Sequence, residues 1–501
     1  MKRWGRRADL TDKNGSAGAS PSRSVAQTSI FGQSLAVVLG LAVVAACEKQ
    51  AAAPDRAIAA EDQSQFASPL HWSAWNEPGS WPQFAHDPLH SGRSQVDLQS
   101  ADLELKWQFR PTDHVWTYKP GYAVFSSPVV GEVGGRTLVI AGHYDRLVYA
   151  VDGETGKPAW TFGPGACVFA APALGRIDGR PFVFLAAVNR SIYAVDAATG
   201  EKQWSYETMP WSFSRSDSIM SSPTVIRDGE RTVLLVGVWN GDRSSAAHVQ
   251  KGELVALNAA DGELIWRKQI ATVPVTSPAV AKFDGRFVVF VAAHHGQVRA
   301  LRLADGEVLW RRALNEETRS SPSIGLVGET ARLVIGTRFH SVFSLEPFTG
   351  VRRWKKQTGY WIDATPAWFT TPQGPAVAAG SYDRSIYAMA ADNGQARWKA
   401  TTGNFAYSSA AIAQLAGRQV VIAMSWDEQV YLLDGADGGQ LWEAASGPLI
   451  WSHVFQGDSL WASPAIAMAK GRPRVFVAAF DGVMYAYGPV DGDRGIETAT
   501  E

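Results

Sequence analysis

The chain has 501 residues, of which 46% are hydrophobic and 19% charged, a composition that suits a folded body with a large core. Its 47 basic and 48 acidic residues leave a net charge of −1, which argues against a nucleic-acid partner because such partners select a basic face. Two cysteines, Cys47 and Cys167, are too few for a disulfide framework.

Residues 1–46 have the pattern of a targeting segment. Six Lys or Arg residues and two Asp residues precede an unbroken apolar run from Leu35 to Ala46. These twelve residues are too few to cross a bilayer but suit the hydrophobic region of a signal peptide. The stretch Val44-Ala45-Ala46-Cys47 resembles the bacterial lipobox, which implies acylation at Cys47. A signal peptide with an incidental cysteine is the alternative.

An acyl group on Cys47 would hold the chain on a membrane without crossing it. Glu48 stands where lipoproteins retained in the inner membrane often have Asp. The lipobox resemblance therefore implies the bacterial outer membrane, with the protein facing the periplasm. Residues 47–80 are rich in Ala, Gln, Ser and Pro without a period, and we expect a flexible tether there.

Two landmarks alternate along the chain from about residue 103. The first is a glycine followed four residues later by tryptophan, and the second is a pair of small residues followed by proline, as in Ser126-Ser127-Pro128. Copies of either landmark are most often 44 residues apart, in the range of four-stranded propeller blades. The tryptophans of the first landmark are Trp160, Trp204, Trp266, Trp310, Trp354, Trp398 and Trp442.

Each repeat unit predicts four strands. The small-small-Pro group opens the first strand, and a turn such as Asp178-Gly179-Arg180 leads to an apolar second strand such as Phe182 to Ala187. An alternating third strand such as Ser191 to Asp196 follows, and the glycine turn leads to the fourth strand, which carries the tryptophan. Alternation and Gly-containing turns favour strands over helices, so we predict an all-β protein of four-stranded antiparallel blades.

The last unit predicts how the ring closes. It opens at Ala462-Ser463-Pro464, but Ile496 stands where its tryptophan is due. The missing tryptophan is Trp107, in a stretch that begins at Leu103 and has no glycine turn before it. We therefore predict an eight-bladed propeller, with the N-terminal strand completing the last blade and leaving no open edge. All eight tryptophans are expected to be architectural, because an indole is a flat apolar wedge with one N–H donor.

The repeated phrase resembles that of a known family. The stretch AVDGETGKPAW, Ala150 to Trp160, is similar to the A-x-D-x-x-T-G-x-x-x-W phrase of the PQQ-type propeller repeat. The stretch from Trp81 to Arg93 looks like the first segment of such proteins. The resemblance covers residues 81–490 and implies the eight-bladed fold. It does not distinguish an enzyme from a non-enzyme, because both share this repeat. Residues 491–501 are expected to form a C-terminal tail.

The places where the repeat lengthens are the candidate functional segments. The interval from a blade tryptophan to the next small-small-Pro proline is normally 12 residues, but three intervals have 21, 19 and 22. Each of these three carries Trp, then Ser or Thr, then a ring-bearing residue, and a fourth insertion separates the second and third strands of its blade. The candidate partner- or ligand-binding residues are Trp116, Tyr118, Trp211, Phe213, Trp239, Arg243, Trp451, His453 and Trp461.

All four insertions are predicted to rise from one rim. In a four-stranded blade, the connection to the next blade and the connection between the second and third strands lie on the same face. Shorter loops there also carry aromatic, His and Arg residues, such as His143 to Arg146, Arg338 to His340 and Trp426 to Glu428. Such side chains anchor protein interfaces and line ligand pockets. Three interpretations stay open: mutual burial of the aromatics, a protein partner, or a small-molecule site.

A quinoprotein dehydrogenase is the enzymatic alternative. Members of that family bind PQQ with Ca²⁺ or a lanthanide, and the chemistry needs oxygen ligands and a carboxylate base. The chain departs from that pattern, because Cys167 has no adjacent cysteine and no carboxylate lies between Arg267 and Pro278. Asp383 and Asp427 are interpreted as loop carboxylates. We expect no cofactor and no metal site, since the rim histidines have no fixed ligand spacing.

A lipid-anchored propeller of this repeat also resembles the propeller lipoprotein subunit of the outer-membrane β-barrel assembly machinery. That resemblance implies a non-catalytic scaffold that binds protein partners in the cell envelope, the barrel-assembly outer-membrane protein among them. We therefore expect a single propeller within a complex, held to the membrane by its lipid alone. A periplasmic PQQ-binding oxidoreductase is the alternative function.

Overall fold

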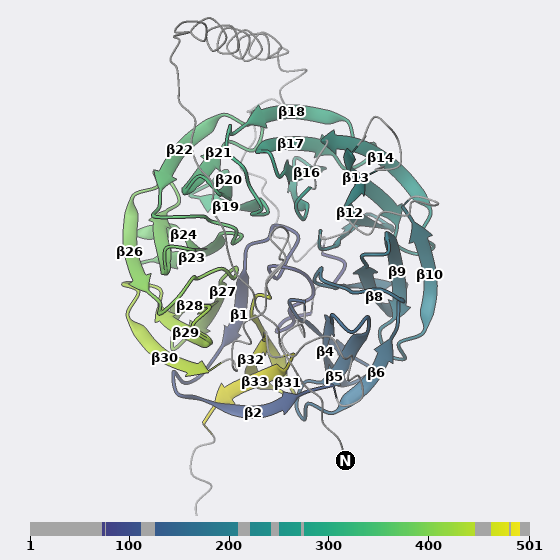
Figure 1. Ribbon diagram of the computed structural model, residues 1–501, viewed down its shortest axis with the longest axis horizontal. Coiled ribbons are helices and arrows are strands. Elements are labelled where there is room, and N and C mark those ends of the chain that lie inside the picture. The colour runs from purple at the N-terminus through teal and green to yellow at the C-terminus, as the bar shows by residue number, and fades with distance from the viewer. Residues whose placement is uncertain are drawn as a thin grey trace, which may run out of the picture. The chain divides into compact units, whose positions relative to one another are not determined.

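The computed structural model describes residues 73–75, 77–111, 126–208, 221–241, 250–271, 275–445, 462–479 and 482–490. Every helix or strand assigned in these residues is a β-strand, and the strands form eight sheets around a common centre (Figure 1). Within these ranges, no helix has the length and apolar character needed to span a membrane.

The predicted eight four-stranded antiparallel blades are confirmed. The strands of each blade are given from the inner to the outer one. Blade 1 consists of β3 (Val129–Val133), β4 (Arg136–Gly142), β5 (Val148–Asp152) and β6 (Pro158–Phe162), and blade 2 of β7 (Ala173–Ile177), β8 (Arg180–Ala186), β9 (Ser191–Asp196) and β10 (Lys202–Glu207). Blade 3 consists of β11 (Thr224–Asp228), β12 (Arg231–Gly241), β13 (Gln250–Asn258) and β14 (Leu264–Ala271), and blade 4 of β15 (Ala279–Phe283), β16 (Arg286–Ala293), β17 (Gln297–Arg302) and β18 (Val308–Ala313). Blade 5 consists of β19 (Ser323–Val327), β20 (Thr330–Thr337), β21 (Ser341–Leu345) and β22 (Arg352–Gln357), and blade 6 of β23 (Ala367–Thr371), β24 (Gly374–Ser381), β25 (Ser385–Ala390) and β26 (Ala396–Thr401). Blade 7 consists of β27 (Ala411–Leu415), β28 (Arg418–Met424), β29 (Gln429–Asp434) and β30 (Gln440–Ala445), and blade 8 of β31 (Ala465–Ala469), β32 (Arg472–Ala478), β33 (Met484–Pro489) and β2 (Leu103–Phe109).

The ring closes through the N-terminal strand, as predicted. Strand β2 is antiparallel to β33, and Trp107 lies opposite Ala486. One strand was not predicted: β1 (Arg93–Asp97) runs parallel to β27 and adds a fifth strand to blade 7. The two N-terminal strands are therefore held by neighbouring blades, β1 by blade 7 and β2 by blade 8.

The blade tryptophans join neighbouring blades. The Nε1 of Trp310 in β18 donates a hydrogen bond to the carbonyl of Pro347 in blade 5 at 2.7 Å, and the other seven make equivalent bonds of 2.7–3.0 Å. The glycine of the next repeat permits this approach, since Gly350 has a φ of 66° and a Cβ there would lie 2.7 Å from the Trp310 ring. Each indole thus places its N–H against a carbonyl between two sheets.

Hydroxyl groups link the starts of the inner strands in a second ring. The amide of Ser321 donates to Oγ1 of Thr365 at 3.2 Å, and the amide of Thr365 donates to Oγ of Ser409 at 2.9 Å. Seven bonds of this kind join successive blades in the described residues, and the one from Ser463 to Ser127 crosses the chain ends. The small-small-Pro group is therefore a contact between blades as well as the start of a strand.

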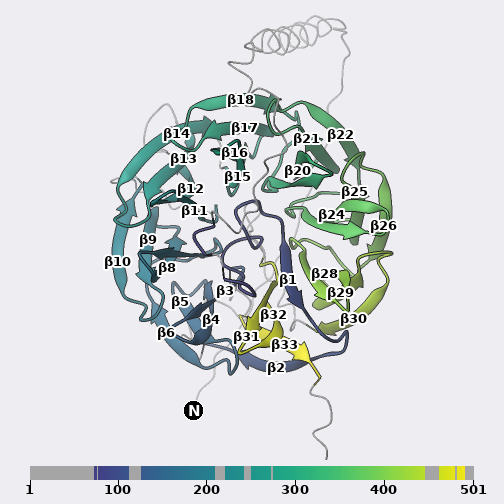
Figure 2. The ribbon, with the colours of Figure 1, turned by 180° about the vertical axis from the view of Figure 1, so that it is seen from behind.

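The N-terminal part of the described chain fills the centre of the ring. We call residues 73–98 the plug; Figures 1 and 2 show it in purple from the two sides. Each inner strand donates at least one backbone amide to a plug oxygen, at 2.7–3.1 Å. From blade 1 to blade 8, these donor–acceptor pairs are Val130–Trp81, Leu174–Pro82, Val225–Gln83, Val280–Pro88, Ile324–Leu89, Trp368–Ser91, Ile412–Gly92 and Met468–Gly79.

The plug partners backbone groups that would otherwise be orphaned. An inner strand has one free edge, and its amides need acceptors once the centre of the ring is filled. Packing also begins before residue 81, the expected start of the propeller. Trp75 is 2% exposed, and the carbonyl of Ala74 accepts a hydrogen bond from the amide of Arg176 at 2.9 Å.

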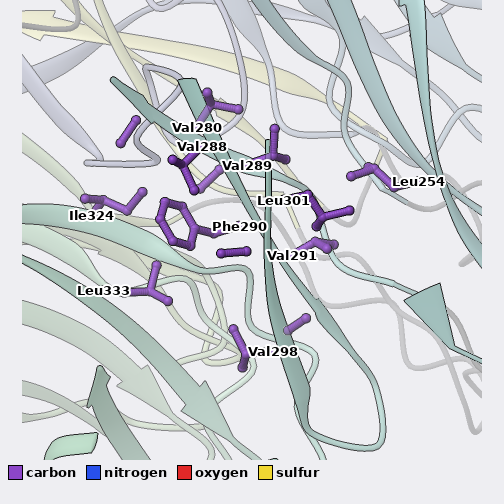
Figure 3. Close-up of a cluster of buried hydrophobic side chains, with 14 of the residues drawn as sticks. Leu254, Val280, Val288, Val289, Phe290, Val291, Val298, Leu301, Ile324 and Leu333 are labelled. Atoms are coloured by element: carbon purple, nitrogen blue, oxygen red, sulfur yellow. The ribbon is translucent and has the colours of Figure 1, made fainter. Parts of the chain in front are cut away.

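The hydrophobic core lies between the blades. Figure 3 shows part of one cluster, in which Phe290 and Val291 of β16 pack with Leu254 of β13 and Leu333 of β20. Strand β16 is buried at nearly every position because neighbouring blades cover both faces of its sheet. Such a core holds the rim loops on rigid strands.

Candidate binding rim

The loops between second and third strands lie against the connections between blades. The amide of Tyr382 donates to the carbonyl of Trp361 at 3.0 Å, and the amide of Trp426 donates to that of Phe405 at 2.9 Å. Similar bonds occur at blades 2 and 5, from Val188 to Cys167 at 3.0 Å and from Arg338 to Glu317 at 2.7 Å. We call these two sets of loops the rim. Both kinds of loop thus meet on one face, as the predicted topology requires.

Six aromatic side chains form a continuous chain along the rim of blades 5 to 7. Neighbouring rings have centroids 5.0–5.9 Å apart, and Tyr360 also contacts His340 at 5.0 Å. The aromatic chain consists of Tyr360, Trp361, Tyr382, Phe405, Trp426 and Tyr407. Its blade 7 end is buried, whereas at blade 5 Tyr360 is 40% exposed and nearby Phe339 is 59% exposed. The rim therefore combines mutual burial with an exposed aromatic end.

Arg338 is held between this aromatic chain and two carboxylates. Its Nε and Nη2 donate to Oδ1 and Oδ2 of Asp363 at 2.9 and 2.7 Å, and its guanidinium lies 4.7 Å from the Trp361 ring centroid. Although burial alone would lower the pKa of Arg338, the bond to Asp363 and the charges of Asp363 and Glu317 raise it. The guanidinium is thus a fixed, permanently charged group.

A buried histidine lies close to the same arginines. Burial, followed by the charges of Arg319 and Arg338, lowers the pKa of His294 to about 3. His294 is therefore neutral at physiological pH. The local potential on this part of the rim is set by arginines and carboxylates.

The rim aspartates named in the sequence close their own loops. Oδ2 of Asp427 accepts hydrogen bonds from the Tyr431 hydroxyl at 2.5 Å and the Gly403 amide at 2.6 Å. Asp383 accepts in the same way from Tyr387 and from Gly359. Their interpretation as loop carboxylates agrees with this geometry, because acceptors engaged in this way are poor candidates for a general base.

The described residues do not fit PQQ with its metal ion. Such a site needs several oxygen ligands around one position and a free carboxylate. Among the described residues, no three His, Cys, Asp or Glu side chains could hold a metal ion together. Asp363 is already bound by Arg338, and the Cys167 thiol donates to the carbonyl of Tyr144 at 3.0 Å. We therefore derive no reaction step through this cofactor.

Of the predicted binding residues, the structure places Trp239. It lies near the end of β12, where β12 and β13 extend beyond the paired strands of other blades, and it is opposite Gly252. Its side chain is partly buried. The remaining candidates lie outside the described residues: Cys47, Trp116, Tyr118, Trp211, Phe213, Arg243, Trp451, His453 and Trp461.

Four members of the aromatic chain were missed in the sequence. Tyr360, Trp361, Phe405 and Tyr407 lie in connections of ordinary length, whereas the search followed lengthened ones. A usable signal was present, since both connections place two aromatic residues within three positions of each other. Composition of the short connections would therefore have identified this part of the rim.

Comparison with known sequences gives one family. The family described as "Outer membrane protein assembly factor BamB" matches residues 104–296 and 294–500. No protein in a search of curated sequences matches the chain.

Solved structures with the same fold include two dehydrogenases and a BamB. A quinohemoprotein alcohol dehydrogenase from Comamonas testosteroni has 16% identity and a TM-score of 0.60, covering 82% of this chain and 80% of that one. A europium-containing methanol dehydrogenase has 14% identity and a TM-score of 0.62, with coverages of 82% and 98%. BamB from Moraxella catarrhalis has 15% identity and a TM-score of 0.50, with coverages of 79% and 100%. At these identities the likeness concerns the fold alone.

Proposed function

Since the chain belongs to the family described as outer membrane protein assembly factor BamB, we propose that it is a non-catalytic scaffold for protein partners in the cell envelope. We further propose that it is a lipoprotein, acylated at Cys47 and facing the periplasm from the outer membrane. The proposed partner is the barrel-forming subunit of the outer-membrane assembly machinery, and the proposed contact surface is the rim.

The observation that carries this proposal is the exposed end of the aromatic chain. Phe339 and Tyr360 are solvent-exposed, and Arg338 is fixed close by through Asp363. Exposed aromatic residues beside an ordered arginine are typical anchors of protein interfaces. The rim carboxylates Asp383 and Asp427 hold loops closed, which favours a rigid binding surface over a catalytic one.

Replacing Phe339 and Tyr360 together by alanine is expected to weaken capture of the barrel-forming subunit at least about tenfold, because interface anchors of this type contribute more than about 1 kcal/mol each. The free energy of unfolding should change by less than about 1 kcal/mol, since Phe339 is 59% exposed and Tyr360, at 40%, lies at the exposed end of the aromatic chain. In-cell crosslinking followed by affinity capture measures the first quantity, and urea denaturation measures the second. The same pair of results is expected for Trp116→Ala and Trp451→Ala.

Leu105→Ala is the matched control, because Leu105 is 48% exposed on the outer strand β2, away from the rim. It should leave capture and stability unchanged. Strong destabilisation by the rim variants would instead support mutual burial of the aromatics. Stoichiometric binding of PQQ with Ca²⁺ or a lanthanide, with alcohol-dependent dye reduction, would overturn the scaffold proposal in favour of an oxidoreductase.

The anchor is tested by Cys47→Ser. We expect the variant to move from the membrane fraction to the soluble fraction, because it loses the acyl chains that partition into the bilayer. Fractionation with immunodetection measures the distribution. Cys167→Ser is the control and should stay with the membrane, since that thiol lies in the propeller against Tyr144. Retention of the Cys47→Ser protein on the membrane would contradict acylation at this residue.

A further inference from the structure

Basic residues are concentrated on one half of the propeller circumference. The outer strands of blades 3 to 6, β14, β18, β22 and β26, carry ten Lys or Arg residues and no Asp or Glu. The outer strands of the other four blades, β30, β2, β6 and β10, carry two basic and three acidic residues. We call the first set of strands the basic arc.

The highest density lies on two neighbouring blades. Strands β18 and β22 lie side by side on the ring (Figures 1 and 2) and carry six basic residues. Lys355 pairs with Glu316, and Arg312 donates to the carbonyl of Gly350 at 2.7 Å. The other four have no ion pair with any described residue: Arg311, Arg352, Arg353 and Lys356.

Like charges are crowded within this half of the ring. Arg311 in β18 lies directly opposite Arg299 in β17, and burial together with Arg311 lowers the pKa of Arg299 to about 10. Burial and Arg353 likewise lower the pKa of Arg332 in β20. The carboxylates of the turn before β18 offer little compensation, because Asp305 and Glu307 are both bound by Arg302. Placing like charges opposite each other costs stability, which an external anion would recover.

We propose that the basic arc, chiefly β18 and β22, docks on an anionic membrane through the phosphates of lipid headgroups. Juxtamembrane Lys and Arg clusters are attracted to such surfaces, and each charge adds to the affinity. Arginine is suited to the contact because its guanidinium can form paired hydrogen bonds with phosphate. A flat surface can touch two neighbouring outer strands at once, which matches the two strands of highest charge.

The composition of the arc favours a lipid surface over a protein. The tryptophans of its strands point inward, with Trp310 and Trp354 only 6% and 7% exposed, so the outward residues are chiefly Lys and Arg. Protein interfaces are enriched in aromatic residues and in Arg and depleted in Lys, so the buried tryptophans and the lysines of the arc argue against such an interface, whereas its arginines do not. Lysines on edge strands also discourage sheet-to-sheet pairing, but that need applies to all eight outer strands, whereas the charge lies on four. The arc and the rim therefore have different chemistry and different expected partners.

Vesicle binding tests the proposal on full-length protein that carries Cys47→Ser in every sample, so that acylation is absent throughout. Vesicles of phosphatidylcholine alone are compared with vesicles that also contain phosphatidylglycerol. The arc variant replaces Arg311, Arg352, Arg353 and Lys356 by glutamine. The control variant removes the same charge elsewhere through Arg136→Gln, Lys157→Gln, Lys202→Gln and Arg231→Gln.

The parent protein is expected to prefer vesicles with phosphatidylglycerol, and added salt should abolish that preference. The arc variant should bind them at least about tenfold more weakly, and the control variant within about twofold of the parent. Equal weakening of both variants, or a parent protein that does not distinguish the two vesicles, would overturn the proposal. Polyglutamate serves as the probe for an acidic protein partner. If the arc variant lost binding to polyglutamate but kept binding to vesicles, the proposal would be overturned and the arc would be assigned to an acidic protein. Where the arc variant fails to fold, a parent protein that does not distinguish the two vesicles still overturns the proposal.

Discussion

Replacement of Asp87 by alanine is expected to lower the free energy of unfolding by at least about 3 kcal/mol. The Asp87 carboxylate organises the turn of the plug: Oδ1 accepts from the amides of Leu89 and Ser91 at 3.0 Å, and Oδ2 accepts from the Ser91 hydroxyl at 2.5 Å. Alanine would leave these buried donors without an acceptor. The same turn places the carbonyls of Pro88 and Leu89 against blades 4 and 5, so its loss would free inner-strand amides as well.

Asp97→Ala is the matched control for this prediction. Asp97 also lies in the plug, and its Oδ1 accepts the amide of Gln99 at 2.8 Å, but this bond is exposed to water. Its loss should cost less than about 1 kcal/mol, because water replaces the acceptor. Urea denaturation of both variants gives the comparison. Equal costs would mean that the plug turn does not contribute to holding the blades together.

The fold could be predicted from the sequence because each blade repeats the same local requirements. A glycine with positive φ, a tryptophan four residues later and a small-small-Pro group recur at one spacing, so counting gave the number of blades. The position of Trp107 also predicted closure, since an unmatched tryptophan at one end corresponded to a missing one at the other. These signals are local in sequence, even though the contacts they make join different blades.

The plug could not be predicted in the same way. Its acceptors bind strands that are far apart in sequence, and most of these acceptors are backbone carbonyls, which leave no mark in residue type. Its bends use positive φ at Ala85, His86 and His90, where no glycine signals a turn. The stretch from Trp81 to Arg93 resembles the first segment of related propellers. That resemblance indicated that such a segment exists but not that it lies in the centre of the ring.

The meeting of two sets of loops on one rim could be predicted from the sequence, whereas the side-chain contacts there could be predicted only in part. Topology alone places two sets of loops on one rim, and the described blades follow that rule. The chemistry depends on which side chains meet, and the pairing of Arg338 with Asp363 across two blades follows from no spacing in the sequence. Among the candidates in the lengthened segments, Trp239 is placed by the structure, and the binding role of all of them stays a prediction.

Acidification between pH 7 and pH 5 is expected to destabilise the protein through two buried histidines. Burial lowers the pKa of His90 to about 4, and burial with two arginines lowers that of His294 to about 3. The unfolded chain takes up these protons near pH 6.5, so it binds more protons than the folded state and stability falls as pH falls. Each histidine should contribute a loss of about 2 kcal/mol over this range, in which few carboxylates titrate.

His90→Asn should remove about half of this pH dependence. Asparagine tolerates the positive φ of 55° at this position, and its amide can donate to the carbonyl of Pro322, which lies 3.0 Å from Nδ1 of His90. His340→Asn is the matched control, since His340 also has positive φ (63°) but is partly exposed beside Tyr360 on the rim. Urea denaturation at pH 7 and pH 5 gives, for each variant, the change in the free energy of unfolding between the two pH values. His340→Asn should keep the full loss of stability between pH 7 and pH 5, and the same full loss in His90→Asn would contradict a contribution from His90.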